Sequence, residues 1–157
     1  MISKQIFVAM RLLLLMGVCV NTMTAMDLSP NTSQAQPKVS APAEISPEEL
    51  KAKIEKKEKV VIIDVRSYDS YVGGPNKIKG ALHYRLRRLR DRLAFAPLKD
   101  LSKDTEIVTY CACADDEASV RAAEIFTAAG FKRVRVLAGG WQAWLSIKGP
   151  VDARPRG

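Results

Sequence analysis

Histidine and cysteine, the side chains that most often hold metals or attack substrates, are scarce in this sequence. The 157 residues include one histidine, His83, and three cysteines. A single histidine excludes a histidine-rich metal site, and a zinc site that combines thiols with His83 would need further ligands. We therefore expect no bound metal.

The sequence also lacks an apolar run long enough to span a bilayer. A basic start and the apolar run Leu12 to Val20 are followed by small or polar residues through Ala25. This order predicts a secretory signal over residues 1–25, and hence an exported, periplasmic protein, because the apolar run is shorter than a membrane-spanning helix. The alternative is an uncleaved N-terminal membrane anchor, since residues 6–10 could lengthen the apolar stretch.

Few cysteines remain after the predicted cleavage. Removing residues 1–25 takes away two basic residues and no acid, so the formal net charge falls from +8 to +6, and only Cys111 and Cys113 are kept. Exported proteins usually carry cysteines as structural disulfides, but two thiols two residues apart cannot connect distant parts of a fold. Their retention suggests chemistry, with a local strained disulfide as the alternative.

The remaining chain predicts one folded domain after a linker. Residues 26–43 carry almost no large apolar side chain, so they cannot offset the entropy of ordering and are predicted to be a flexible linker. The folded domain is expected over residues 44–152, and residues 153–157 are expected to form a short tail.

Helix signals and β-branched runs alternate along the domain. Ser46 is predicted to cap the first helix, with Pro47 at its first position and Glu49 completing a reciprocal capping box. The predicted strands are residues 60–65, 107–110 and 134–137. One later helix is expected around Leu86, Leu89 and Leu93 and ends before Pro97. Another is expected over residues 118–129 and ends before Gly130. This alternation predicts an α/β fold with a central parallel sheet flanked by helices.

The two cysteines lie at the junction between one of these strands and the next helix. A thiol at such a junction meets converging backbone N–H groups and the positive end of a helix dipole, and both favour the nucleophilic thiolate. The segment from Ile107 to Ser119 is therefore the predicted site of chemistry.

Six short motifs follow one another between about residue 45 and residue 151. They are Asp64-Val65-Arg66, Ile78-Lys79-Gly80-Ala81, Tyr110-Cys111, Ala128-Ala129-Gly130-Phe131, Leu137-Ala138-Gly139-Gly140-Trp141 with Ala143-Trp144, and Gly149-Pro150-Val151. In these motifs and their order, the sequence resembles the rhodanese-like sulfurtransferases. The resemblance implies a three-layer α/β fold and a cysteine that carries sulfane sulfur as a persulfide from a donor such as thiosulfate to a thiophilic acceptor. It implies no metal or organic cofactor.

The resemblance also implies which residues form the site. Cys111 occupies the family's nucleophile position directly after Tyr110, and some relatives carry the same Tyr-Cys-x-Cys loop. Cys113 is the alternative nucleophile, because its spacing to Ser119 is the usual one. The loop residues expected to support the bound anion are Ala112, Cys113, Ala114, Asp115, Asp116 and Glu117, together with Arg66 from an earlier strand end.

The loop departs from the family pattern in charge. Three acids, Asp115, Asp116 and Glu117, follow the cysteines where relatives often carry an arginine. Acids close to the sulfur would oppose a thiolate and repel thiosulfate. Alternatively, they point outward and complement the helix N-terminus. The missing arginine argues against the related phosphatases and arsenate reductases, which need it to hold an oxyanion.

Two other functions remain as alternatives to sulfur transfer. They are a thiol–disulfide redox module in which Cys111 and Cys113 cycle together, and a catalytically weak rhodanese-like domain that binds proteins. The expected partners are a small sulfur-containing anion or a thiol acceptor, and a membrane only if the signal is uncleaved. Nucleic acid is not an expected partner, because the chain is predicted to be exported and carries no known nucleic-acid-binding motif. The sequence gives no basis for predicting how many copies of the chain assemble.

Smaller expectations concern side chains outside the loop. Asp64 and Arg66 are predicted to pair and fix a strand-to-loop corner, with Arg66 facing the site as the alternative. His83 is expected in a loop or at the surface. The arginine-rich helix around Leu89 is expected to have a solvated face on which Arg87 pairs with Asp91. Trp141 and Trp144 are expected to pack in the core. Gly139 and Gly140 are expected to form a tight turn against the active-site loop.

Overall fold

The structure is a computed structural model that describes residues 41–155. The predicted signal at residues 1–25 and most of the predicted linker at 26–43 lie outside the described residues. No helix within residues 41–155 is both long and apolar enough to cross a membrane.

Short strands and helices alternate along the described residues. In chain order they are β1 (Ala43–Ile45), α1 (Pro47–Glu55), β2 (Val60–Asp64), α2 (Tyr68–Val72), β3 (Asn76–Ile78), β4 (Leu82–His83), α3 (Leu86–Arg92), the 3-10 helix η1 (Leu98–Asp100), β5 (Glu106–Tyr110), α4 (Glu117–Ala128), β6 (Arg133–Leu137), α5 (Gly140–Ser146) and β7 (Val151–Ala153).

Five of the strands form one parallel sheet, in the order β1-β6-β5-β2-β4. The β-branched runs predicted as strands become β2, β5 and β6, and β5 lies in the middle of the sheet, as expected for a strand covered on both faces. The strands β3 and β7 form a separate antiparallel pair. The predicted α/β fold with a central parallel sheet is confirmed.

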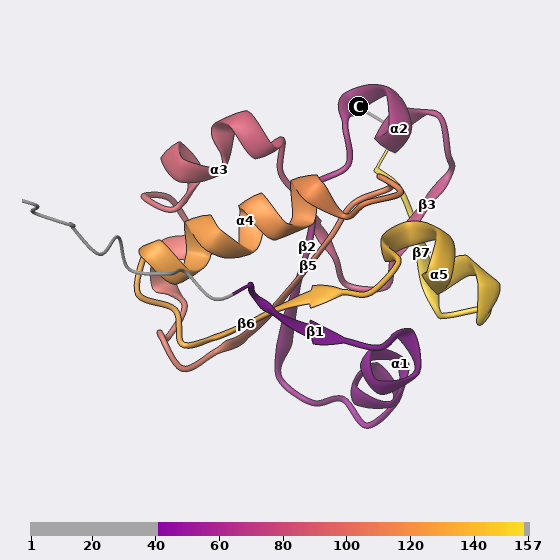
Figure 1. The fold of residues 1–157 in the computed structure, drawn as a ribbon, viewed down its shortest axis with the longest axis horizontal. Helices are drawn as coiled ribbons and strands as arrows, with labels where there is room; N and C mark the ends of the chain where they lie inside the picture. Colours follow the sequence, from indigo (N-terminus) through magenta and orange to yellow (C-terminus); the bar gives the residue numbers. More distant parts are fainter. Residues whose placement is uncertain (1–40, 156–157) are drawn as a thin grey trace, which may run out of the picture. The chain divides into compact units, whose positions relative to one another are not determined.

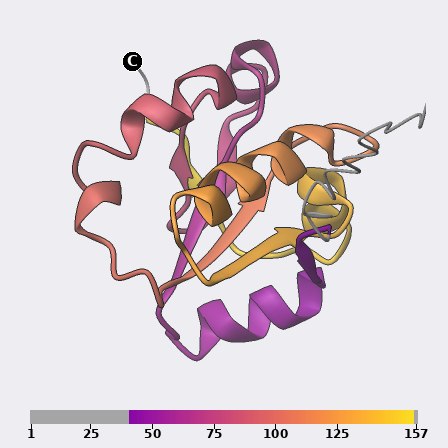
Figure 2. The same cartoon turned by 60° about the vertical axis from the view of Figure 1, so that its left-hand side comes forward.

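Helices cover both faces of the sheet and create two hydrophobic cores. Figure 1 shows α3 and α4 on one face and α1 and α5 on the other, and Figure 2 shows the same layers after rotation. Side chains along β5 alternate between the faces, as the pleat of a strand requires. Tyr110 packs with the core that includes Leu50 and Trp144, whereas Cys111 packs with the core that includes Leu89 and Phe126. The cysteine therefore lies on the α3 and α4 side of the sheet.

The element ends largely follow the predicted signals. Ser46 Oγ accepts a hydrogen bond from the Glu49 N–H at 3.1 Å, which confirms the N-cap of α1. The reciprocal contact predicted for Glu49 is wrong, because its carboxylate pairs with Arg135 of β6 instead. Gly130 has a φ of 88° after α4, which confirms the left-handed position.

The domain begins and ends slightly beyond the predicted boundaries. Ala43, placed in the linker by its composition, pairs with Arg135 in the sheet, and Ala153, placed in the tail, pairs with Asn76. Both segments are three-residue edge strands held by backbone hydrogen bonds, so their sequences carry little hydrophobic signal.

The arginine-rich helix α3 packs through Leu89, which is fully buried. It ends before Pro97, as predicted. The predicted ion pair between Arg87 and Asp91 is wrong, because Asp91 lies 3.9 Å from Arg88, at the i,i+3 spacing. Arg87 instead lines a hollow next to Cys113.

Candidate active site around Cys111 and Cys113

Cys111 follows the last residue of β5 and begins the loop that leads into α4. Its side chain is fully buried, and both cysteines of the described residues are free thiols. The neighbouring Thr109 donates from its hydroxyl to the Ser119 carbonyl oxygen at 2.8 Å, which fixes the first turn of α4 against β5. The strand and the helix thus hold the cysteine from both sides, as the sequence predicted for this junction.

Three groups surround the Cys111 sulfur. The backbone N–H of Cys113 donates to Sγ at 3.3 Å, the Ser119 hydroxyl lies 3.7 Å away, and Asp116 Oδ1 lies 3.9 Å away. The Ser119 hydroxyl also donates to the Asp116 carbonyl oxygen at 2.7 Å, a much closer contact than the one to sulfur. The loop amide is therefore the clearest donor that faces the sulfur, and it would stabilise negative charge there.

Cys113 is exposed at the surface, whereas Cys111 is buried. It lines a hollow of about 420 Å³ whose other walls come from the end of β2, the start of α2 and the start of α3. Partial burial and then the hydrogen bond to Cys111 raise the pKa of Cys113. The residues that line the hollow are Val65, Arg66, Ser67, Tyr68, Arg85, Leu86, Arg87, Cys113 and Ala118.

The three loop acids do not act alike. Asp116 adopts a left-handed φ of 53° as the N-cap residue of α4, and its carboxylate turns inward, with Oδ1 facing Cys111 and Oδ2 accepting from the Gly139 N–H at 2.9 Å. Burial raises the pKa of Asp116. Asp115 accepts from the Glu117 N–H, and Glu117 pairs with Arg121 at the exposed surface. The predicted repulsion applies to Asp116, and the predicted outward orientation applies to the other two acids.

The turn between β6 and α5 holds the other side of the loop. The Trp141 N–H donates to the Cys111 carbonyl oxygen at 2.8 Å. A Cβ atom on Gly140 would collide with that same oxygen and would lie 2.9 Å from Asp116 Oδ1. Gly139 and Gly140 have φ values of 66° and 49°. The predicted tight turn against the active-site loop is confirmed, and only glycine allows this approach.

A buried ion pair lies beneath the turn. Arg66 Nη2 lies 2.8 Å from Asp64 Oδ2 and also donates to the Asn76 carbonyl oxygen, and the Tyr110 hydroxyl donates to Asp64 at 2.7 Å. The predicted pairing of Asp64 with Arg66 is therefore confirmed. The guanidinium is 1% exposed and Trp141 covers it at 4.4 Å, so the alternative role of Arg66 in binding an anion is not supported.

The sequence reasoning missed His83. It was expected in a loop or at the surface, but it belongs to β4, stacks on Tyr71 with ring centroids 3.7 Å apart, and lies 3.7 Å from Asp64. That distance to Asp64 is too long for a hydrogen bond. A two-residue strand has no periodicity that could have revealed this position. Trp144 is fully buried, as predicted, and Trp141 stacks on Tyr110.

The fold and the loop define a class of α/β protein that carries a thiol at the carboxyl end of a central parallel strand. The family model for the rhodanese-like domain matches residues 46–147. The chain therefore belongs to the rhodanese-like domain family.

Solved structures with the same fold include proteins from several bacteria. The Alr3790 protein from Anabaena sp. is 32% identical, with a TM-score of 0.59, over 70% of this chain and 82% of that chain. The BH2092 protein from Bacillus halodurans is 29% identical, with a TM-score of 0.60, over 71% of this chain and 77% of its own. A thiosulfate sulfurtransferase from Pseudomonas aeruginosa is 22% identical, with a TM-score of 0.57, and the match covers 71% of this chain but only 20% of that protein. At this identity the last match shows the fold alone. No curated protein matches the sequence significantly.

Proposed function

We propose that the protein is a sulfurtransferase that carries sulfane sulfur as a persulfide on Cys111. The observation that carries the proposal is the position of the Cys111 sulfur at the end of β5, where the Cys113 N–H donates to it at 3.3 Å. A donor N–H aimed at this sulfur stabilises the attacking thiolate and the same thiolate when it leaves as the persulfide is consumed. The family membership supports the same activity.

The reaction needs only the two substrates and this thiolate. The Cys111 thiolate attacks the outer sulfur of thiosulfate, a new S–S bond forms, and sulfite leaves with the electron pair of the old S–S bond. A thiolate acceptor then attacks the outer persulfide sulfur, takes it, and returns Cys111 to the thiolate. Sulfur is transferred with no net oxidation, so no redox cofactor enters the cycle.

Asp116 makes thiosulfate a poor donor in this proposal. At 3.9 Å, a carboxylate opposes a thiolate by about 4 kcal/mol at an effective dielectric of ~20. A dianionic donor meets the same repulsion, whereas a donor with at most one negative charge at its sulfur meets less of it. We therefore favour an organic persulfide as the physiological donor and a thiol as the acceptor, and we place the reaction after export of the chain.

A second candidate function is thiol–disulfide exchange between Cys111 and Cys113. The observation in its favour is that both cysteines are free and adjacent, with the Cys113 N–H 3.3 Å from the Cys111 sulfur and Cys113 exposed to an incoming disulfide. In that cycle, the two thiols would reduce a disulfide substrate and become a disulfide themselves.

Intact mass after exposure to a donor separates these functions. The protein, Cys111→Ser and Cys113→Ser are incubated with thiosulfate or with a polysulfide, and each mass is recorded before and after reduction. We expect one added sulfur atom on the protein and on Cys113→Ser, and none on Cys111→Ser. Added sulfur on Cys111→Ser alone would assign the reaction to Cys113. A decrease of two hydrogen masses in the unsubstituted protein, with no such decrease in either variant, would favour thiol–disulfide exchange. No mass change in any form would contradict both functions.

A further inference from the structure

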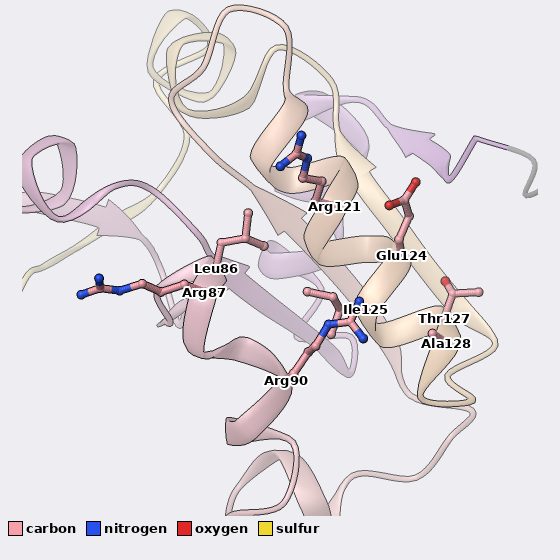
Figure 3. Close-up of a pocket in the computed structure, with 8 residues that line it drawn as sticks. All are labelled: Leu86, Arg87, Arg90, Arg121, Glu124, Ile125, Thr127 and Ala128. Carbon is pink, nitrogen blue, oxygen red and sulfur yellow. The ribbon is translucent and has the colours of Figure 1, made fainter.

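A groove runs between α3 and α4 on the same side of the sheet as Cys111. Figure 3 shows Leu86 of α3 and Ile125 of α4 in the space between the two helices, with Arg90 extending across it and Arg121 and Glu124 projecting from α4. The groove encloses about 760 Å³. Leu86 and Ile125 are half-buried and give it an apolar floor.

The rim of the groove is basic. It carries the exposed arginines Arg87, Arg90 and Arg121 and one acid, Glu124. Among residues 41–155, neither Arg87 nor Arg90 forms an ion pair, whereas Arg121 is paired with Glu117. Arg90 therefore keeps its full charge available to a ligand in the groove, and Arg87, which extends away from α4, keeps its charge available to a ligand that continues into the Cys113 hollow (Figure 3).

The groove lies next to the hollow that holds Cys113. Leu86 and Arg87 line both spaces, and Cys113 and Ala118 line the hollow on the far side of them. A ligand that extends from the groove past Leu86 and Arg87 therefore reaches the exposed thiol, close to the loop that encloses Cys111. An inorganic anion would fill only a small part of such a long, apolar-floored space.

We propose that the groove binds an acidic segment of a partner protein, whose cysteine enters the Cys113 hollow as the sulfur acceptor. Its carboxylates meet Arg87 and Arg90, and its apolar side chains rest on Leu86 and Ile125. This inference rests on the proposed function and names its acceptor. The partner's thiolate attacks the outer sulfur of the Cys111 persulfide, the S–S bond on Cys111 breaks, and a new one forms on the partner, with no net oxidation.

Synthetic peptides test the groove without knowledge of the partner. The acidic probe is an acetylated peptide with one cysteine followed by alternating glutamate and leucine, and its control carries lysine in place of each glutamate. Binding of the fluorescently labelled peptides is measured by anisotropy without any sulfur donor, on the protein and on Arg90→Glu. Arg92→Glu is the matched control, because Arg92 lies on the same helix but lines a different hollow, next to His83. Transfer is then measured from the persulfidated protein to each peptide and to dithiothreitol.

We expect tighter binding of the acidic peptide than of the lysine peptide, and roughly five- to ten-fold weaker binding of the acidic peptide to Arg90→Glu. Arg92→Glu should retain the affinity, Glu124→Gln should increase it, and transfer to dithiothreitol should not change in any of these variants. Equal binding of both peptides, or equal losses in Arg90→Glu and Arg92→Glu, would overturn the inference while the proposed function stands. Selective binding without transfer to any thiol would uphold the groove and contradict the proposed function.

Discussion

The carboxylate of Asp116 lies 3.9 Å from the Cys111 sulfur, whereas those of Asp115 and Glu117 contact the Glu117 N–H and Arg121. The same carboxylate binds the Gly139 N–H, so it is fixed in place rather than free to turn away. In the proposed reaction, this negative charge opposes the thiolate that attacks the donor.

Asp116→Asn should make Cys111 more reactive near neutral pH. The amide keeps an oxygen for the Gly139 N–H but removes the charge beside the sulfur, so the thiolate forms more readily. We expect iodoacetamide to alkylate Cys111 roughly ten-fold faster, as measured by mass spectrometry in a Cys113→Ser background. Asp115→Asn is the control, because Asp115 points to the Glu117 N–H. An equal gain from both substitutions would mean that general loop charge matters and that the contact with Asp116 does not.

Gly140→Ala should destabilise the domain more than an ordinary glycine replacement does. The new Cβ collides with the Cys111 carbonyl oxygen, and the φ of 49° strains any other residue. We expect a loss of about 2–4 kcal/mol in the free energy of unfolding, measured with urea. Gly80→Ala has a comparable φ of 75° but nothing within 4 Å of its Cβ, so it should cost only about 1 kcal/mol. Similar losses for both would show that the loop shifts to admit the methyl group.

Arg66→Met should cost more stability than the double variant Asp64→Asn with Arg66→Met. Removing the guanidinium alone leaves the fully buried Asp64 carboxylate without its main partner, at a cost of about 3–5 kcal/mol. Asp64→Asn removes the stranded charge, and the Tyr110 hydroxyl keeps an oxygen to donate to. Urea unfolding of Asp64→Asn, of Arg66→Met and of the double variant measures the coupling free energy between the two side chains. Additive losses would show that the two side chains stabilise the domain independently.

The same pair predicts a loss of stability in acid. Burial acts to raise the pKa of Asp64, but the approach of His83 and the hydrogen bonds from Arg66 and Tyr110 outweigh it and hold the pKa below its usual value of about 4. A lowered pKa means that the unfolded chain binds the proton first, so this stability is present above about pH 4 and is lost as the pH falls further.

Titration of Asp116 changes the free energy of unfolding in the opposite direction, in a neighbouring pH range. Its raised pKa means that the folded protein binds the proton first, so its contribution weakens stability as the pH rises above about 4. Comparing urea unfolding of the protein and of Asp64→Asn from pH 3 to pH 7 isolates the Asp64 part. The difference between the two should shrink on acidification, and a constant difference would contradict the assignment.

Much of the fold could be read from the sequence, because its strongest signals are local. Runs of β-branched residues predicted β2, β5 and β6 to within a residue at each end, and the Ser46 cap and Gly130 marked helix ends. The pair β3 and β7 was not predicted, since each strand has three residues and the pairing joins distant parts of the chain. Glu49 was misread for the same reason, because its partner Arg135 is 86 residues away.

The site could be located from the sequence, but its electrostatics could not. A thiol between a β-branched strand and a helix start identified Cys111 and Cys113. The inward turn of Asp116 depends on its left-handed backbone and on the distant Gly139 N–H, neither of which is written in the local pattern. The basic groove was hidden as well, because half of its rim belongs to α3 and half to α4.

The hydrogen bonds from Trp141 to Cys111 and from Gly139 to Asp116 make the loop part of a two-segment unit. A transplant of residues 111–117 alone into a related scaffold would leave the Cys111 carbonyl and the Asp116 carboxylate facing a turn of different shape. The segment from Gly139 to Trp141 must therefore travel with the loop. In engineering terms, the candidate site is discontinuous in sequence, and its second half contains no reactive side chain.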